Sequence, residues 1–192
     1  MKPTIKTGLA LLLLLVISCA KESAYKNSSS LVQTSVKQAS SFRIGQHYGG
    51  GIIFFIDPSG QHGLIADTGD LTRVKWYNPL NEIHPQTGAT HTEYGWGLRN
   101  TLKIISTEGD SGLYAARECA MSTRGGYTDW FLPTKEELND LYLQKNVVGG
   151  FEGHYWSSSR LRVYAWKEDF EDGDFYLGYQ NATVRVRAVR AF

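Results

Sequence analysis

The stretch Asp129-Trp-Phe-Leu-Pro-Thr-Lys-Glu-Glu-Leu138 carries the clearest structural signal in the 192-residue chain. Within it, Thr134 and Glu137 form a Thr-x-x-Glu capping box, a pattern typical of the first turn of a helix. The apolar residues that follow recur on one helical face: Leu138, Leu141 and Tyr142. Because Gly149 favours the end of a helix, the sequence predicts a helix that begins after Thr134 and stops before Gly149.

Upstream of this helix, the sequence predicts a β-hairpin and two further helices. The apolar run Ile52–Ile56 is followed by the turn sequence Asp57-Pro-Ser-Gly60 and by a second run at His62–Ala66. The glycine triplet at residues 49–51 precedes a strand and no Gly-Lys-Ser/Thr follows it, so a phosphate-binding loop is disfavoured. Residues 67–97 resemble a loop. The expected helices cover residues 98–106 and 111–122.

The region after the capped helix is predicted to be mostly extended. Four short segments have strand-like composition: Tyr155–Ser159, Val163–Phe170, Phe175–Tyr179 and Val184–Ala191. Strands at both ends of the chain with helices between them favour an α+β fold with short antiparallel strands over a parallel βαβ series. A composition of 42% hydrophobic and 12% aromatic residues is typical of a globular core, in which we expect Trp130 and Phe131 to lie.

Several ordered motifs resemble one protein family. They are Gly-Gln-His-Gly-Leu-Ile-Ala at 60–66, the stretch at 129–138, Gly-Gly-Phe at 149–151, Tyr-Trp-Ser-Ser-Ser at 155–159 and Val-Arg-Ala-Val-Arg-Ala-Phe at 186–192. Together they resemble the C-terminal domain of the Legionella collagen-like adhesins, which is related to C-type-lectin-like domains and formylglycine-generating enzymes. The resemblance implies a compact domain with adjacent first and last strands, and in those adhesins a role in binding sulfated polysaccharides. A collagen-like region is absent here, so its trimer is not implied.

The N-terminal residues resemble a bacterial lipoprotein signal peptide. Lys2 and Lys6 precede the apolar run Leu9–Ile17, which is too short to span a bilayer, and Ser18 precedes Cys19 as in a lipobox. In that family the cysteine carries diacylglycerol and an amine-linked acyl chain such as palmitate. We therefore expect a signal peptide at 1–18, a lipidated flexible tether at 19–41 and a single domain at 42–192, with an ordinary cleaved signal as the alternative.

Lipidation at Cys19 affects both the location and the remaining chemistry. Residues 20–22 lack an aspartate directly after the cysteine, which favours the outer membrane, on either its periplasmic face or the cell surface. Cys119 is then left without a cysteine partner, and a buried structural thiol is expected rather than a reactive one. Removing residues 1–18 leaves 18 basic and 19 acidic side chains, a balance that gives no indication of a nucleic-acid partner.

No recognisable catalytic or metal-binding set is present in the sequence. A copper site of the formylglycine-generating type needs two cysteines, whereas lipidation of Cys19 leaves only Cys119. The sequence contains no zinc-binding motif and no Gly-x-Ser-x-Gly elbow of a serine hydrolase. Neither of the calcium-binding triplets of C-type lectins occurs. We therefore expect a protein that is not an enzyme and has no cofactor. The acidic run at 168–174 lacks the spacing of a calcium loop, and leaves open a choice between a calcium site and a solvated turn.

A ligand surface of basic and aromatic side chains is the remaining candidate site. The predicted members are Arg160, Arg162, Lys167, Tyr176 and Tyr179. Guanidinium groups suit sulfate or carboxylate and flat rings suit sugar faces, and strand alternation would place Arg160 and Arg162 on one face. The alternative is that these cations pair with neighbouring carboxylates. The arginines of the C-terminal motif are instead expected to be structural: Arg185, Arg187 and Arg190.

These observations predict a cell-envelope lipoprotein, attached to the membrane by its lipid anchor, whose domain recognises glycan or another envelope polymer. A structural or assembly subunit that binds an envelope protein is the alternative.

Overall fold

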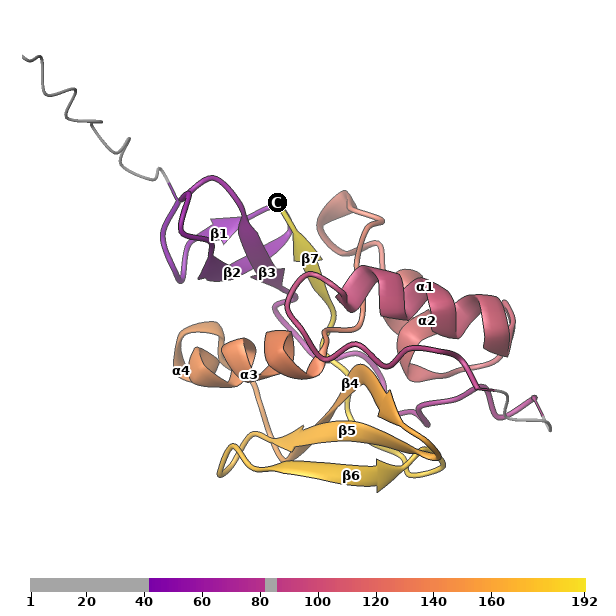
Figure 1. The fold of residues 1–192 in the computed structure, drawn as a ribbon. Helices are drawn as coiled ribbons and strands as arrows, with labels where there is room; N and C mark the ends of the chain where they lie inside the picture. The colour runs from indigo at the N-terminus through magenta and orange to yellow at the C-terminus, as the bar shows by residue number, and fades with distance from the viewer. Residues whose placement is uncertain (1–41, 82–85) are drawn as a thin grey trace, which may run out of the picture. The chain divides into compact units, whose positions relative to one another are not determined.

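The computed structural model describes residues 42–81 and 86–192, which form two small antiparallel sheets with short helices between them (Figure 1). The first sheet has the order β1-β2-β3-β7 and the second the order β4-β5-β6. The strands are β1 His47–Tyr48, β2 Gly51–Ile56, β3 Gly63–Ala66, β4 His154–Leu161, β5 Tyr164–Asp169, β6 Phe175–Tyr179 and β7 Val189–Ala191. The helices are α1 Gly97–Glu108, α2 Ala115–Ala120, the 3-10 turn Arg124–Gly126, α3 Lys135–Leu143 and α4 Lys145–Val148. The predicted α+β class is confirmed.

The predicted signal peptide, tether and Cys19 lie outside the described residues. Within residues 42–81 and 86–192, none of the helices is long and apolar enough to cross a bilayer. The bounds proposed for the tether and the domain therefore remain predictions.

The predicted hairpin is confirmed as β2 and β3. The side chain of Asp57 shapes its turn, since Asp57 Oδ1 accepts hydrogen bonds from the hydroxyl of Ser59 at 2.6 Å and from the backbone N–H of Gly60 at 3.1 Å. A Cβ atom at Gly63 would collide with the carbonyl oxygen of Phe55, so the close pairing of the two strands needs glycine there.

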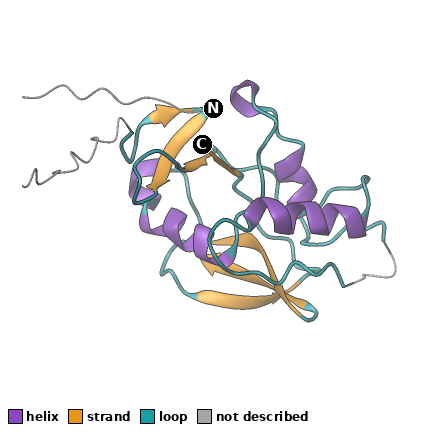
Figure 2. Ribbon diagram, turned by 45° about the horizontal axis from the view of Figure 1, so that its top comes forward, coloured by secondary structure: helices purple, strands orange, loops and turns teal. Residues whose placement is uncertain are grey.

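The C-terminal strand β7 pairs with β3 and so brings the end of the chain beside its first hairpin, as Figure 2 shows. The predicted strand at Val184–Ala191 is wrong in length, because only residues 189–191 form a regular strand. Val184 makes an isolated bridge to Val74, and the carbonyls of Val186 and Ala188 accept hydrogen bonds from the irregular segment after β3. Because the segment after β3 is not a regular strand, residues 184–188 cannot form a regular ladder with it.

The capping box at the start of α3 is confirmed. Thr134 Oγ1 accepts from the N–H of Glu137 at 3.2 Å, and Glu137 Oε2 accepts from the N–H of Thr134 at 2.8 Å. The helical segment does not run straight to Gly149, because Gln144 leaves helical geometry at ψ 16° and separates α3 from α4. The preceding helices also differ in length from the prediction: α1 is longer, and α2 begins only at Ala115 because Tyr114 is extended.

The core contains the side chains that the sequence placed there. Trp130 and Phe131 are 1% and 4% exposed, and Trp76 and Trp156 are fully buried. Cys119 is also fully buried, and burial raises the pKa of its thiol well above the usual value. The interpretation of Cys119 as a structural thiol rather than a reactive one is therefore confirmed.

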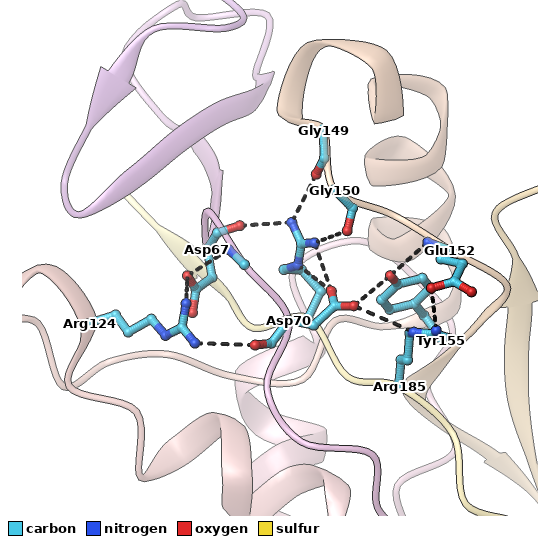
Figure 3. A network of polar contacts seen from close by, with 10 residues as sticks. Asp67, Asp70, Arg124, Gly149, Gly150, Glu152, Tyr155 and Arg185 are labelled. Atoms are coloured by element: carbon cyan, nitrogen blue, oxygen red, sulfur yellow. Dashed lines mark hydrogen bonds and ion pairs between the residues drawn. The ribbon is translucent and has the colours of Figure 1, made fainter.

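A network of charged side chains ties the C-terminal segment to the rest of the domain (Figure 3). Arg187, whose side chain is fully buried, donates from Nε to Asp70 Oδ1 at 2.8 Å and also reaches the carbonyl oxygens of Asp67, Gly149 and Gly150. Arg185 pairs with Asp70 and Glu152, and Arg190 binds both oxygens of Asp129. The structural interpretation of these three arginines is confirmed.

Candidate functional site

The β4-β5-β6 sheet carries the open face on which the site is built. Strand pairing places Trp156, Ala165 and Gly178 on the side that packs on the core. A Cβ atom at Gly178 would lie 2.8 Å from the ring of Trp156, so glycine lets β6 approach the buried indole. The indole nitrogen of Trp156 donates to the carbonyl of Val74 at 3.1 Å, which fixes the sheet against the loop after β3. The opposite side of β5 and β6 is partly exposed.

On this opposite side Glu168, which pairs with Phe175, is buried. The other five side chains are at least partly exposed and form what we call the aromatic face: Tyr164, Trp166, Phe175, Leu177 and Tyr179. They share one side because they alternate along β5 and β6 and because Tyr164 pairs with Tyr179 and Trp166 with Leu177. The rings of Tyr164 and Tyr179 lie 4.9 Å apart between centroids. Leu177 is 40% exposed and Tyr179 is 64% exposed. The face therefore offers apolar and aromatic surface to solvent along an edge strand.

A lysine from α3 caps part of the aromatic face. The ammonium of Lys135 lies 4.6 Å from the ring centroid of Trp166 and 4.4 Å from that of Phe175. Lys135 thus makes two cation–π interactions, one with each ring. The faces of aromatic rings attract an ammonium group that is held above them. The backbone N–H of Lys135 donates to Ser159 Oγ at 3.0 Å, so the start of α3 is fixed on β4.

At the Phe175 end of β6, a hollow of about 350 Å³ opens against α3; we call it the α3 hollow. It is lined by Phe55, Tyr94, Lys135, Glu136, Asn139, Asp140 and Phe175. Burial raises the pKa of Asp140, and the neighbouring carboxylate of Glu136 raises it further. Two carboxylates and three aromatic rings thus share one cavity.

At the Tyr179 end of β6, a second hollow of about 320 Å³ lies beside the β4–β5 turn; we call it the turn hollow. It is lined by Tyr77, Gln86, Arg160, Val163, Tyr179, Gln180 and Asn181. Arg160 is 4% exposed and donates to Gln86 Oε1 at 2.6 Å and to the carbonyl of Arg162. The Gln180 amide donates to the carbonyl of Tyr164 at 3.3 Å. The hollow therefore combines two phenol rings with planar amide and guanidinium groups.

The five predicted site residues do not form one surface. Alternation does not place Arg160 and Arg162 on one face, because Arg162 lies in the turn after β4 with φ of +57°. Arg160 is buried in the wall of the turn hollow, which it shares with Tyr179. Lys167 and Tyr176 pair with each other on the side of the sheet opposite to Tyr179. The predicted patch is thus divided between two faces and a turn.

The alternative for the predicted cations was that they pair with neighbouring carboxylates. Within residues 42–81 and 86–192, neither Arg162 nor Lys167 forms an ion pair with a carboxylate at 4 Å or less. Lys167 instead lies 5.8 Å from the ring centroid of Tyr176. Whether these five residues contact a ligand remains a prediction.

The carboxylate side chains of the acidic run at 168–174 do not point toward one common position. Glu168 is buried, Asp169 lies 3.7 Å from His154 Nδ1, and Asp172 Oδ1 accepts from the N–H of Asp174 at 2.8 Å. Asp169 also accepts from the N–H of Glu171 at 3.0 Å. In the described part of the chain, no group of three or more His, Cys, Asp or Glu side chains is placed to hold a metal ion. This geometry favours the turn over the calcium site.

Sequence reasoning missed most of the aromatic face. Trp166, Phe175 and Leu177 were not predicted as site residues, and neither was Lys135 on a different element. The period-two pattern of Phe175, Leu177 and Tyr179 along one strand was a usable signal for this face.

Two small antiparallel sheets, a capped helix between them and a last strand that joins the sheet of the first hairpin define a compact α+β domain. The implied adjacency of the first and last strands is wrong in detail, because β7 pairs with β3 and lies at the edge of the sheet opposite to β1. The chain belongs to the Lcl C-terminal domain family, which it matches over residues 68–190. The resemblance to the adhesin family is thereby confirmed, and it indicates an adhesin-related domain of a cell-envelope or surface protein. A comparison with curated proteins finds no match.

Proposed function

We propose that the chain is a lipoprotein of the bacterial outer membrane whose domain binds glycan and catalyses no reaction. The observation that carries the proposal is the turn hollow beside the aromatic face. Its phenol rings offer flat apolar surfaces to a sugar ring, while the amides of Gln86, Gln180 and Asn181 offer donors and acceptors to hydroxyl groups. A mostly preformed concavity with a few placed polar groups is typical of small-ligand sites.

Binding of an envelope protein is the second candidate function. It is favoured by exposed apolar side chains around β6 and the β4–β5 turn: Leu161, Val163 and Leu177 are 47%, 56% and 40% exposed. β6 is also an edge strand of its sheet, and such an edge can pair with another chain. The two candidates differ in whether a purified polysaccharide is sufficient for binding.

Replacing Tyr179 with alanine tests the glycan proposal. Loss of an exposed ring from the turn hollow is expected to weaken glycan binding about tenfold, since aromatic stacking contributes on the order of 1 kcal/mol. A glycan array would identify the ligand, and isothermal titration with the best glycan would measure the change. Tyr176→Ala is the matched comparison, because Tyr176 lies on the opposite face of the same strand: a loss in Tyr176→Ala alone would mean that the glycan binds that face instead. Failure of the native domain to bind any glycan, with stoichiometric capture of one envelope protein, would favour the second candidate.

The proposed anchor is tested at Cys19. Cys19→Ala is expected to abolish labelling by a fatty-acid analogue and to release the protein from the membrane fraction, because the thiol is the proposed attachment point. Cys119→Ala serves as the control, since that thiol is buried. Labelling that persists in Cys19→Ala would overturn the anchor.

A further inference from the structure

We propose that the α3 hollow is a subsite for a positively charged amine of the bound glycan. The ligand class is thus a linear polysaccharide that contains amino sugars with free amino groups. This inference rests on the proposed function and adds to it the chemistry of the sugar unit.

The walls of the α3 hollow are aromatic and come from three separate segments. Phe55 belongs to β2, Tyr94 to the segment before α1 and Phe175 to β6. The rings of Phe55 and Tyr94 lie 4.4 Å apart between centroids, and Tyr94 is 37% exposed. An ammonium group is attracted to the faces of such rings. Lys135 already places its own ammonium over Phe175, so the geometry suits this type of group.

The helix side of the hollow is acidic. Glu136 and Asp140 lie four residues apart and therefore on one face of α3. One carboxylate oxygen of Glu136 accepts from the N–H of Tyr94 at 3.2 Å, and within residues 42–81 and 86–192 the other oxygen accepts no hydrogen bond. Burial raises the pKa of the Tyr94 phenol, and the charges of Glu137, Asp140 and Asp57 raise it further. Lys135 is the positive group in this lining, and its ammonium is directed to Trp166 and Phe175.

The described lining of the hollow has an excess of negative charge. Glu168 of β5 is fully buried, and neither of its carboxylate oxygens has a hydrogen-bond partner in the described part of the chain. Burial raises the pKa of Glu168 to about 8, so at neutral pH this group is largely protonated and takes little of the charge of Lys135. Lys135 is then the single cation against the two carboxylates of Glu136 and Asp140 in the described lining.

The same charges disfavour a sulfate or carboxylate group in the α3 hollow, because like charges repel at short range. The turn hollow differs, since its described lining contains a guanidinium and no carboxylate. Phe175 and Tyr179 connect the two hollows along β6, a span of about 13 Å at the usual rise per residue. A linear glycan lying on the aromatic face can thus place an amine at one end and neutral hydroxyls at the other.

The test compares two oligosaccharides of equal length, a glucosamine oligomer and its fully N-acetylated form, by isothermal titration at low salt. The glucosamine oligomer is expected to bind about tenfold more tightly, since only it carries ammonium groups. Asp140→Asn is expected to remove this preference. The control variant is Asp110→Asn, because Asp110 is 91% exposed and lies outside the hollow.

Equal affinity for the two oligomers, or a preference that Asp140→Asn leaves unchanged, would overturn the inference. A preference lost equally in Asp110→Asn would also overturn it, since the attraction would then be unspecific. The proposed function would survive these results if both oligomers still bound and Tyr179→Ala weakened them. Conversely, amine-dependent binding that ignores Tyr179→Ala would support the α3 hollow and overturn the role of the turn hollow.

Discussion

Replacing Arg187 with methionine is expected to lower the free energy of unfolding by about 3–5 kcal/mol, the usual loss when one partner of a buried ion pair is removed. The side chain is fully buried, and its Nη2 lies 2.7 Å from Asp70 Oδ1. Its remaining donors hold the carbonyl oxygens of Asp67 and Gly150 at 3.1 Å and 2.8 Å. Methionine fills similar space but leaves the carboxylate and these carbonyls without their donor.

Urea denaturation followed by fluorescence would measure this loss. Arg185→Met is the matched comparison, because the closer partner of Arg185 is Glu152, which is 77% exposed, while its distance to Asp70 is 3.7 Å against 2.7 Å for Arg187. An exposed pair of this kind contributes about 1 kcal/mol or less. Arg187→Lys keeps the charge but removes the planar fork of donors, so its effect should fall between the two. A loss for Arg187→Met no greater than for Arg185→Met would contradict the central role of Arg187.

The partners of Arg187 also show where sequence reasoning ends. The capping box at Thr134 and the turn at Asp57 were predictable because their hydrogen bonds join residues at most a few positions apart. Arg187 and Asp70 are 117 residues apart, and nothing in the local pattern of either predicts the other. The sequence therefore indicated a structural role for the arginine, but not the network in which it acts.

The candidate site was predictable only in part, for a related reason. Tyr179 was found because it follows the acidic run and its flat ring suits a sugar face. Arg160 and Arg162 were assigned to one face because alternation was assumed to continue, whereas β4 has an irregular register between Trp156 and Arg160 and then ends in a turn. Lys135 could not be placed over Trp166 from sequence, since α3 and β5 meet only in the folded domain.

Helix α3 is important both for the fold and for the proposed subsite. Its capping box fixes its first turn, and Glu137 of that box also accepts from the N–H of Gly95 at 2.8 Å. The segment carrying Tyr94 is therefore held against the helix that carries Glu136 and Asp140. A rigid first turn thus sets the distance between the aromatic walls and the carboxylates, which is the arrangement that a small charged group needs.

Replacing Glu168 with glutamine is expected to remove a large part of the pH dependence of stability. The pKa of Glu168 is raised to about 8, because burial outweighs the opposing charge of Lys135 and the charge of Asp140 adds to the effect of burial. The unfolded carboxyl titrates near its ordinary value of 4.5, so between pH 4.5 and 8 the folded chain holds a proton that the unfolded chain releases. The contribution of this group to stability is therefore complete below pH 4.5, declines as pH rises to 8, and stays low above it.

The size of the decline follows from the shift, because each unit of pKa corresponds to about 1.4 kcal/mol. The native chain should thus lose several kcal/mol between pH 4.5 and pH 9 relative to Glu168→Gln, as measured by urea unfolding at each pH. Comparing slopes with pH cancels any constant cost of burying the amide. Glu171→Gln is the control, because Glu171 is exposed in the neighbouring turn and its removal should leave the slope unchanged. Parallel curves for the native chain and Glu168→Gln would contradict the prediction, because they would mean that water or a cation reaches this carboxylate in solution and keeps it ionised at neutral pH.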